Sequence, residues 1–321
     1  MKKNGIKSLF LIFMTIVLIF SFGTGCTKQD AENEKGNSES EEKTNKEVNY
    51  PLDITDQFGN KVTIEKEPKR IVSLAPSHTE ILFALGLGEK IAGVTDFCNY
   101  PKEALSKEKV GSYQNINLEK IISLEPDLVI QYGQGNEETN NKMREAKIAL
   151  VSYEPENVLQ IEDTIVDIGK ITNTEEKAKE IVSSMEKRKD AVVEKVKNAK
   201  KISTFYEIWY DPLMAAGPGS FMDELINLAG GKNIAGDAAE GYPQFDLEQL
   251  VERNPDVYLV SKDSKEKTTD SIRKRPGYED INAVKNDRIY LLDPDIVSRP
   301  GPRIIDALEL IAKSIHPELF K

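Results

Sequence analysis

Residues 117–130, NLEKIISLEPDLVI, decide the fold, because the chain carries a related segment at residues 246–259, DLEQLVERNPDVYL. The two align at a constant offset of 129 residues, with identical Leu-Glu and Pro-Asp pairs and apolar residues at matching positions. Apolar residues at i, i+3 and i+4 predict one face of a short helix, and the proline predicts its end before a buried parallel strand. Two such units predict two lobes of related build. The alternative is a chance match between segments common in α/β proteins.

The first 25 residues differ in character from the rest of the chain. Lys2, Lys3 and Lys7 precede an apolar run at 9–22, and Gly-Thr-Gly stands before Cys26. A basic start followed by an apolar segment too short for a typical membrane span predicts a secretory signal. The segment resembles a bacterial lipoprotein signal, which implies that Cys26 becomes the lipidated first residue of the mature chain. An uncleaved helical anchor at the same membrane face is the alternative.

Residues 26–48 are polar and lack aromatic side chains, which predicts a disordered tether. The net charge of the full chain is −11, and it falls to −14 once the three signal lysines are removed. This acidic balance argues against nucleic acid as a partner. With Cys26 lipidated, Cys98 has no second cysteine to pair with, so we expect the fold to be stabilised by its core without a disulfide.

The remaining sequence predicts an α/β fold. Residues 49–68 predict a leading hairpin. Residues 69–156 alternate strand and helix patterns, and residues 201–321 do so again, which predicts two βα lobes with mostly parallel sheets. Between the lobes, residues 157–200 keep helical spacing with a break at 172–174, and they predict a long backbone helix that joins the lobes.

The first helix of the N-terminal lobe has a recognisable start signal. Ser77 and Glu80 have the spacing of a capping box, and the apolar residues 81–85 lead to Gly86, which predicts the end of the helix. Both side chains are therefore expected at the helix N-terminus, bonded to its free backbone groups.

Catalytic motifs find little support in the sequence. His78 and His316 are the only histidines, and Gly219 lacks the surrounding pattern of a nucleophile elbow or a phosphate loop. We therefore expect a binding protein that is no enzyme and holds no resident metal or cofactor. The alternative from another class is a surface enzyme or metal-handling protein that uses Cys98 and His78. Against it, His78 is expected at a helix start and Cys98 as a small packed residue.

Aromatic residues gather where the predicted strands end. Ligands of open α/β sheets bind beyond the carboxyl ends of the strands, and flat rings suit a broad, partly apolar ligand with a polar periphery. Asp295, Ser298 and Arg299 precede the final helix and are candidates for the polar contacts. Tyr100 and Tyr210 are expected to be ordinary core or rim residues. The rings are Phe97, Tyr100, Tyr113, Tyr132, Trp209, Tyr210 and Tyr242.

Six stretches carry a family resemblance: KRIVSLAPSHTEILFALGLGEKIAGVT, CNYP, VGSYQNINLEKIISLEPDLVI, AAGPGSFMDELINLAGGKNI, YPQFDLEQLVERNPDVYLV and SRPGPRIIDALELIA. From about Lys69 to the C-terminus the chain resembles the solute-binding proteins of ABC importers that carry cobalamin, siderophores and haem, and most closely the cobalamin-binding branch. The resemblance implies a ligand held between two lobes, a long backbone helix that limits hinge closure, and no covalent chemistry.

The resemblance also implies where the ligand binds. Tyrosines stand at 113, 132 and 242 where some relatives carry tryptophan, so the choice among related corrinoids stays open. A ferric siderophore or haem is the alternative ligand within the same family. By position, the residues placed around a corrinoid are Phe97, Tyr113, Tyr132, Tyr242, Asp295 and Arg299, with Trp209 near a position that is aromatic in relatives.

The glutamates of the repeat, Glu119 and Glu248, lie off the apolar helix faces and are expected to point to solvent. The resemblance implies that each one docks on arginines of a membrane subunit. Two distant rim charges would give orientation and a fast on-rate more than affinity. Without the duplication, two solvated helix charges of little energetic value would be the default interpretation.

The sequence thus predicts an extracytoplasmic lipoprotein, anchored to the cell membrane through Cys26, that works as a monomer. It would capture cobalamin or a related corrinoid and deliver it to the membrane subunits of an ABC importer. A membrane-bound sensory protein with the same fold and ligand is a further alternative.

Overall fold

The computed structural model describes residues 48–262, 264 and 267–321. The expected signal, the lipidation site Cys26 and residues 26–47 of the expected tether lie outside the described residues. Within the described part of the chain, no helix is long and apolar enough to cross a membrane.

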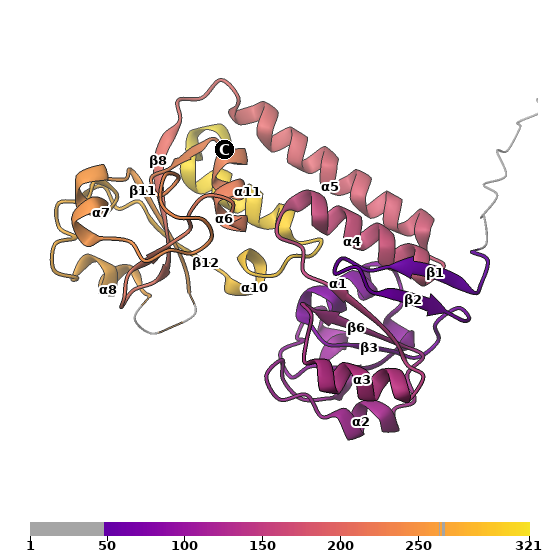
Figure 1. The fold of residues 1–321 in the computed structure, drawn as a ribbon. Helices are drawn as coiled ribbons and strands as arrows, with labels where there is room; N and C mark the ends of the chain where they lie inside the picture. The colour runs from indigo at the N-terminus through magenta and orange to yellow at the C-terminus, as the bar shows by residue number, and fades with distance from the viewer. Residues whose placement is uncertain (1–47, 263, 265–266) are drawn as a thin grey trace, which may run out of the picture. The chain divides into compact units, whose positions relative to one another are not determined.

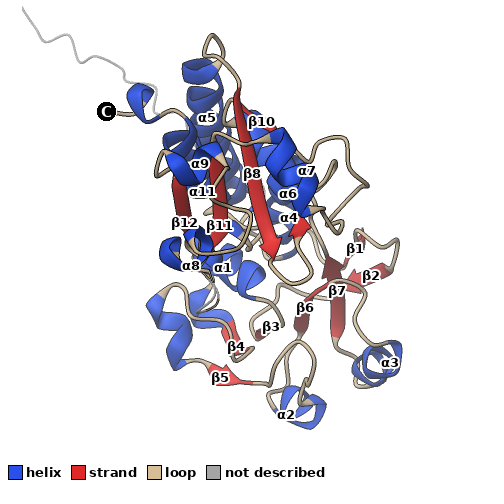
Figure 2. Ribbon diagram, turned by 90° about the vertical axis from the view of Figure 1, so that its left-hand side faces the viewer, coloured by secondary structure: helices blue, strands red, loops and turns tan. Residues whose placement is uncertain are grey.

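The N-terminal lobe is built on a five-stranded sheet in the order β5-β4-β3-β6-β7, with every pair of neighbours parallel. The interior strands are almost fully buried, which explains their continuous apolar runs. The strands are β3 (Ile71–Ser73), β4 (Ile91–Val94), β5 (Glu108–Lys109), β6 (Leu128–Tyr132) and β7 (Ala149–Tyr153), and the helices are α1 (Pro76–Ala84), α2 (Leu118–Ser123), α3 (Glu137–Glu145) and the 3₁₀ turns at Gly88–Lys90 and Lys102–Ser106 (Figure 2).

The C-terminal lobe repeats this plan with four parallel strands in the order β10-β8-β11-β12, while a short strand, β9, pairs antiparallel with β8. The prediction of mostly parallel sheets is confirmed in both lobes. The elements are β8 (Ile202–Trp209), β9 (Met214–Ala215), β10 (Gly231–Asn233), β11 (Val257–Ser261), β12 (Ile289–Leu292), α6 (Phe221–Leu228), α7 (Leu247–Arg253), α8 (Thr269–Arg273), α9 (Asn282–Lys285), α10 (Pro294–Val297), α11 (Ile304–Ile315) and a 3₁₀ turn at Pro317–Leu319.

The repeated segments occupy equivalent places in the two sheets. Strands β6 and β11 each pair with the first strand of their sheet on one side and with an edge strand on the other. The residue before each proline, Glu125 or Asn254, has a positive φ of 47° or 42°, so helices α2 and α7 end in the same left-handed turn. A chance match does not explain a shared backbone turn and a shared place in the sheet.

The aspartate kept in both copies ties each unit to the start of its lobe. Asp127 accepts hydrogen bonds from the backbone N–H groups of Lys69 and Arg70, just before β3. Asp256 accepts one from the Ser203 hydroxyl at 2.8 Å, at the start of β8. The Pro-Asp pair therefore fixes the register between the first strand of each sheet and the repeated strand.

Two helices connect the lobes. The sequence break predicted at 172–174 separates α4 (Val158–Ile171) from α5 (Glu175–Val196), and the two helices pack along each other (Figure 1). Gly169 permits this approach, because a Cβ at that position would lie 2.5 Å from the Ala178 Cβ. The longer helix, α5, also packs against α11 of the C-terminal lobe.

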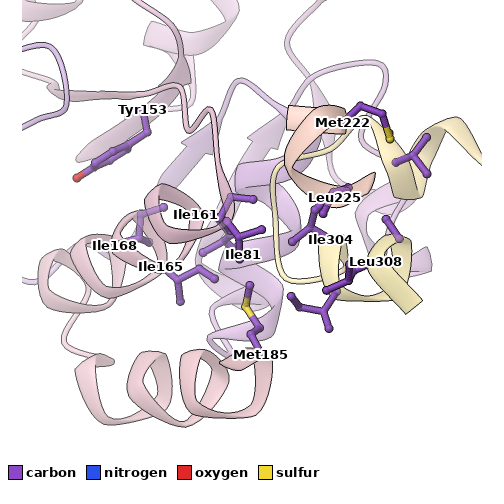
Figure 3. Close-up of a cluster of buried hydrophobic side chains, with 14 of the residues drawn as sticks. Ile81, Tyr153, Ile161, Ile165, Ile168, Met185, Met222, Leu225, Ile304 and Leu308 are labelled. Carbon is purple, nitrogen blue, oxygen red and sulfur yellow. The ribbon is translucent and has the colours of Figure 1, made fainter. Parts of the chain in front are cut away.

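One apolar core runs through both lobes and the connecting helices (Figure 3). Burial of this surface is the main stabilising term of the fold, at about 25 cal/mol per Å². Because the core is shared, the lobes do not meet as two independent bodies. Its members include Ile81 and Tyr153 of the N-terminal lobe, Ile161, Ile165 and Ile168 of α4, Met185 of α5, and Met222, Leu225, Ile304 and Leu308 of the C-terminal lobe.

The predicted hairpin is present as β1 (Leu52–Thr55) and β2 (Lys61–Ile64). Its turn is docked on the carboxyl end of β7. Asp56 accepts a hydrogen bond from the Ser152 N–H at 3.1 Å, and the Gln57 side chain bonds both the N–H and the C=O of Glu154. The hairpin therefore fixes the end of the strand from which Glu154 emerges.

The expectation of a capping box at Ser77 and Glu80 is wrong. Helix α1 begins at Pro76, and its N-cap, Ala75, makes no side-chain cap. Proline suits the first helical position because its missing N–H would be unsatisfied there in any case. Ser77 and Glu80 are instead buried within the helix, and Glu80 faces arginines from the C-terminal lobe.

Candidate functional site

A cleft of about 650 Å³ opens between side chains of the two lobes. The N-terminal lobe contributes the carboxyl ends of β6 and β7, and the C-terminal lobe contributes the end of β8 and the loops around α6 and α10. This is the strand edge at which ligands of parallel sheets bind. The lining residues are Tyr132, Glu154, Pro155, Glu156, Tyr206, Ile208, residues 218–222, residues 240–242, Val297, Ser298 and Pro300.

Four aromatic rings line the cleft, and the sequence predicted two of them. Tyr132 and Tyr242 face it from opposite lobes. Tyr206 and Phe221 were missed, because Tyr206 lies inside an apolar strand pattern and Phe221 is the first residue of a helix. Burial, aided by Glu154, raises the pKa of Tyr132 to about 12, and burial also raises the pKa of Tyr242. Both hydroxyls therefore stay protonated near neutral pH.

The charge of the cleft is one-sided. Glu154, Glu156 and Glu240 line it, whereas none of its described lining residues is a lysine, arginine or histidine. An anionic ligand would be repelled, and a ligand with N–H or O–H donors at its edge would find acceptors. These glutamates could not be predicted from the sequence, since single acidic residues in loops carry no distinguishing pattern.

A second hollow of about 560 Å³ lies on the N-terminal lobe and shares Tyr132 with the cleft. Tyr113, predicted as a ligand contact, lines this hollow together with residues from the start of α3. Tyr132 therefore separates two neighbouring spaces, one acidic and one lined by side-chain amides.

Asp295 and Arg299 lie in a network that bridges the lobes and are not among the residues that line the cleft. Arg299 donates hydrogen bonds to Asp295 Oδ1 at 2.6 Å and to Asn99 Oδ1 at 2.7 Å, and Asn99 Nδ2 donates to Asp295 Oδ2 at 2.8 Å. Ser298, between the two predicted residues, does line the cleft. The network therefore forms one edge of the site.

Glu80 is the centre of this network. The residue is 4% exposed, and its carboxylate accepts two hydrogen bonds from Arg303, at 2.8 and 2.6 Å, and one from Arg299 at 3.1 Å. These bonds raise the pKa of the Arg303 guanidinium. We call Glu80, Asn99, Asp295, Arg299 and Arg303 the interlobe clamp.

The other predicted rings lie outside the cleft lining. Phe97 is 65% exposed, and its carbonyl accepts a long hydrogen bond of 3.4 Å from Arg299. Trp209 is half exposed at the end of β8, and its indole N–H donates to the Asp211 carbonyl. Tyr100 packs under Arg303 and Tyr210 under Arg275, at 3.9 and 3.8 Å, which agrees with their expected rim and core roles.

Cys98 and His78 do not form a surface metal or catalytic site. Cys98 is fully buried, and its Sγ lies 3.1 Å from the hydroxyls of Thr79 and Thr95. His78 is also fully buried, beside the rings of Tyr132 and Tyr153. Among the residues that the structure describes, no cluster of three or more His, Cys, Asp or Glu side chains could hold a metal ion. His78 lies in the first turn of α1, as expected, but among the residues that the structure describes neither of its ring nitrogens has a hydrogen-bond partner.

Comparison with known proteins identifies the group to which this architecture belongs. The model of the periplasmic binding protein family matches residues 71–296. The chain belongs to the periplasmic binding protein family. It is a substrate-binding component of an ABC importer and not an enzyme, which confirms the expectation from its sequence.

The relatives of this periplasmic binding protein are named for different ligands, or for none. It is 40% identical over 280 residues to the uncharacterized ABC transporter substrate-binding lipoprotein YvrC of Bacillus subtilis, covering 85% of this chain and 88% of the relative. A possible iron-binding solute-binding protein of Staphylococcus epidermidis is 33% identical, with a TM-score of 0.69, over 78% of this chain and all of that one. The vitamin B12-binding protein BtuF of Vibrio cholerae is 29% identical, with a TM-score of 0.66, over 79% and 98%.

The repeated glutamates of this periplasmic binding protein are on the surface, one on each lobe. Glu119 in α2 and Glu248 in α7 are both exposed, as expected from the helix periodicity. Within the described part of the chain neither side chain forms a hydrogen bond or an ion pair. Both carboxylates are therefore available to a partner.

Removal of one charge from the interlobe clamp should strongly reduce the stability of the protein. We expect Glu80→Gln to lower the free energy of unfolding by about 3 kcal/mol, because it leaves Arg299 and Arg303 without their buried counter-charge. Urea unfolding followed by circular dichroism measures this loss. Glu137→Gln, at an exposed position of α3, serves as the control and should change stability little. Equal stability of the two variants would contradict the role of the clamp.

His78 predicts a dependence of stability on pH. Burial lowers its pKa to about 3, from an ordinary value of 6.5, so the unfolded chain binds the proton more readily. The contribution of this histidine to the free energy of unfolding is therefore fully present above pH 6.5. It is lost as the pH falls toward 3. In His78→Phe, the drop in unfolding free energy between pH 7 and pH 5 should shrink by about 2 kcal/mol. Tyr153→Phe, a neighbour that does not titrate in this range, should keep the wild-type dependence, and an unchanged dependence in both would refute the assignment.

Proposed function

We propose that this protein captures cobalamin or a related corrinoid between its lobes and delivers it to the membrane subunits of an ABC importer. The observation that carries the proposal is the composition of the cleft. It has aromatic faces, three carboxylates and, among its described lining residues, no cationic side chain. A corrinoid is a broad macrocycle whose edge carries uncharged carboxamide arms, and these arms donate hydrogen bonds to carboxylates.

The alternative ligands of the family fit this cleft less well. Haem presents two carboxylates, and many ferric siderophores are anionic, so each would need a lysine or arginine facing it. Arg299 and Arg303, at one edge of the site, are already paired with the carboxylates of Glu80 and Asp295, so they bring no net positive charge to an anionic ligand. A neutral, amide-rich ligand needs no such partner.

We propose that the predicted site residues divide into three groups around the ligand. Tyr132 and Tyr242 contact the face of the macrocycle from opposite lobes, and Tyr113 reaches its edge from the second hollow. Asp295 and Arg299 contact the ligand at the edge of the cleft, next to Ser298. Phe97 and Trp209 are exposed rim residues that would cover the ligand at the mouth of the cleft.

Delivery requires a second surface, which we assign to Glu119 and Glu248. One exposed, unpaired carboxylate on each lobe matches a permease that carries a basic patch on each of two subunits. Both charges can be engaged together only at one lobe separation, which the shared core and the clamp hold. We further propose that lipid attached to Cys26 keeps the protein at the extracytoplasmic face of the cell membrane, where it works as a monomer.

Calorimetric titration of the purified protein with cyanocobalamin, haem and a ferric hydroxamate tests the proposed ligand. We expect tight binding of cyanocobalamin and weak binding of the anionic ligand haem, because the described lining residues of the cleft offer hydrogen-bond acceptors and no cation. Tight binding of haem or of the iron complex, with no heat from the corrinoid, would overturn the proposal.

The aromatic contacts predict losses of affinity. Tyr132→Ala and Tyr242→Ala should each weaken corrinoid binding by about 1 kcal/mol or more, because each removes a ring face from the ligand. Leu159→Ala removes an exposed apolar side chain of α4 away from the cleft and should leave the affinity unchanged. Wild-type affinity in both tyrosine variants, measured by the same titration, would remove these rings from the site.

Unlike the tyrosine variants, variants of the docking glutamates should affect transport and leave ligand affinity unchanged. Glu119→Ala and Glu248→Ala should keep wild-type affinity for the ligand and reduce its uptake by cells, and the double variant should reduce uptake further. Glu137→Ala, another exposed helix glutamate of the N-terminal lobe, should transport normally. A loss of ligand affinity in the docking variants would contradict this assignment.

A further inference from the structure

The second hollow, on the N-terminal lobe, has a chemistry of its own. None of its described lining residues is charged, and several carry side-chain amides. It adjoins the cleft through Tyr132, so one ligand of sufficient size can occupy both spaces. The lining residues that carry hydrogen-bonding or aromatic groups are Tyr113, Gln114, Asn115, Gln131, Tyr132, Asn136, Thr139 and Asn140.

Two buried amides in this hollow are held in a fixed orientation by one backbone carbonyl. The Gln134 C=O accepts a hydrogen bond from Gln131 Nε2 at 3.0 Å and from Asn140 Nδ2 at 2.7 Å. Because a carbonyl bonds only to the nitrogen of an amide, this contact fixes which end of each amide is oxygen. Gln131 Nε2 also donates to the Ser152 hydroxyl at 2.8 Å.

The amide oxygens are left as acceptors. Asn140 is 5% exposed, and its Oδ1 has no hydrogen-bond partner, which is a costly state for a buried polar atom. Gln131 is 3% exposed, and its Oε1 accepts no hydrogen bond from the residues that the structure describes. Two acceptors without donors favour an occupant that brings N–H or O–H groups.

Gly135 keeps one of these acceptors open. Its φ is +65°, and a Cβ at this position would lie 2.5 Å from Gln131 Oε1. A side chain here would therefore fill the space in front of that oxygen. The positive φ favours glycine, and an added Cβ would displace the Gln131 amide.

We propose that this hollow is a subsite for an uncharged donor arm of the ligand, a carboxamide or a hydroxyl, and that Gln131 and Asn140 read it. The inference rests on the proposed function and names the part of the ligand that the second hollow would select. A carboxylate arm is excluded, because it would meet two acceptor oxygens and no cation among the lining residues described.

Calorimetric titration of the intact protein with two probes tests the subsite. The probes are cyanocobalamin and its monocarboxylic acids, in which one peripheral carboxamide is hydrolysed to a carboxylate. The wild type should bind cyanocobalamin at least tenfold more tightly than the acid whose altered arm lies in the hollow. Asn140→Leu and Gly135→Ala should each weaken cyanocobalamin binding about tenfold and shrink the discrimination against that acid.

Matched variants separate the subsite from the fold. Asn141→Leu changes the same residue type at an exposed position of the same helix. Gly59→Ala imposes a similar positive φ, +81°, with no atom within 4 Å of the added Cβ. Both should bind cyanocobalamin like the wild type. If Asn140→Leu and Gly135→Ala also bind and discriminate like the wild type, the subsite is wrong while the proposed function stands. If the wild type binds no cyanocobalamin, both are overturned.

Discussion

The ion network around Glu80 is the constraint on which the rest of the structure depends. A buried carboxylate is tolerable only while Arg299 and Arg303 stay bonded to it, and those arginines come from the other lobe. Together with the apolar core that passes through α4 and α5, the clamp holds the two strand edges opposite each other. The cleft is therefore formed before any ligand arrives, and the exposed glutamates of α2 and α7 keep one separation.

The acidic character of the cleft follows from the clamp, because the clamp pairs the neighbouring arginines with carboxylates of its own. Because the arginines nearby neutralise Glu80 and Asp295, the walls of the cleft carry Glu154, Glu156 and Glu240 without cationic neighbours among the described lining residues. The adjoining hollow adds amide acceptors in place of charge. Both spaces thus favour a neutral ligand rich in hydrogen-bond donors, with tyrosine rings to cover its apolar faces.

Much of the fold could be predicted from the sequence, because helix and strand periodicity and the proline turns are local signals. The repeat at 117–130 and 246–259 predicted two lobes, and the break at 172–174 predicted where the connecting helices divide. Short elements such as β5, β9 and β10 were missed, since two or three residues carry no periodicity. The clamp was missed for a different reason: Glu80 and Arg299 are 219 residues apart, and the local spacing of Ser77 and Glu80 imitated a capping box. Tyr132 and Tyr242 were predicted into the cleft, but its acidic residues come from loops that only the tertiary fold brings together.

A crystal structure of the protein grown with cyanocobalamin would show directly whether the cleft between the lobes holds the corrinoid. We predict the macrocycle between Tyr132 and Tyr242, with carboxamide arms facing the glutamates of the cleft and one arm within hydrogen-bond distance of the Asn140 and Gln131 side-chain oxygens. A corrinoid bound elsewhere on the surface, or a cleft that stays empty at saturating ligand, would contradict the account.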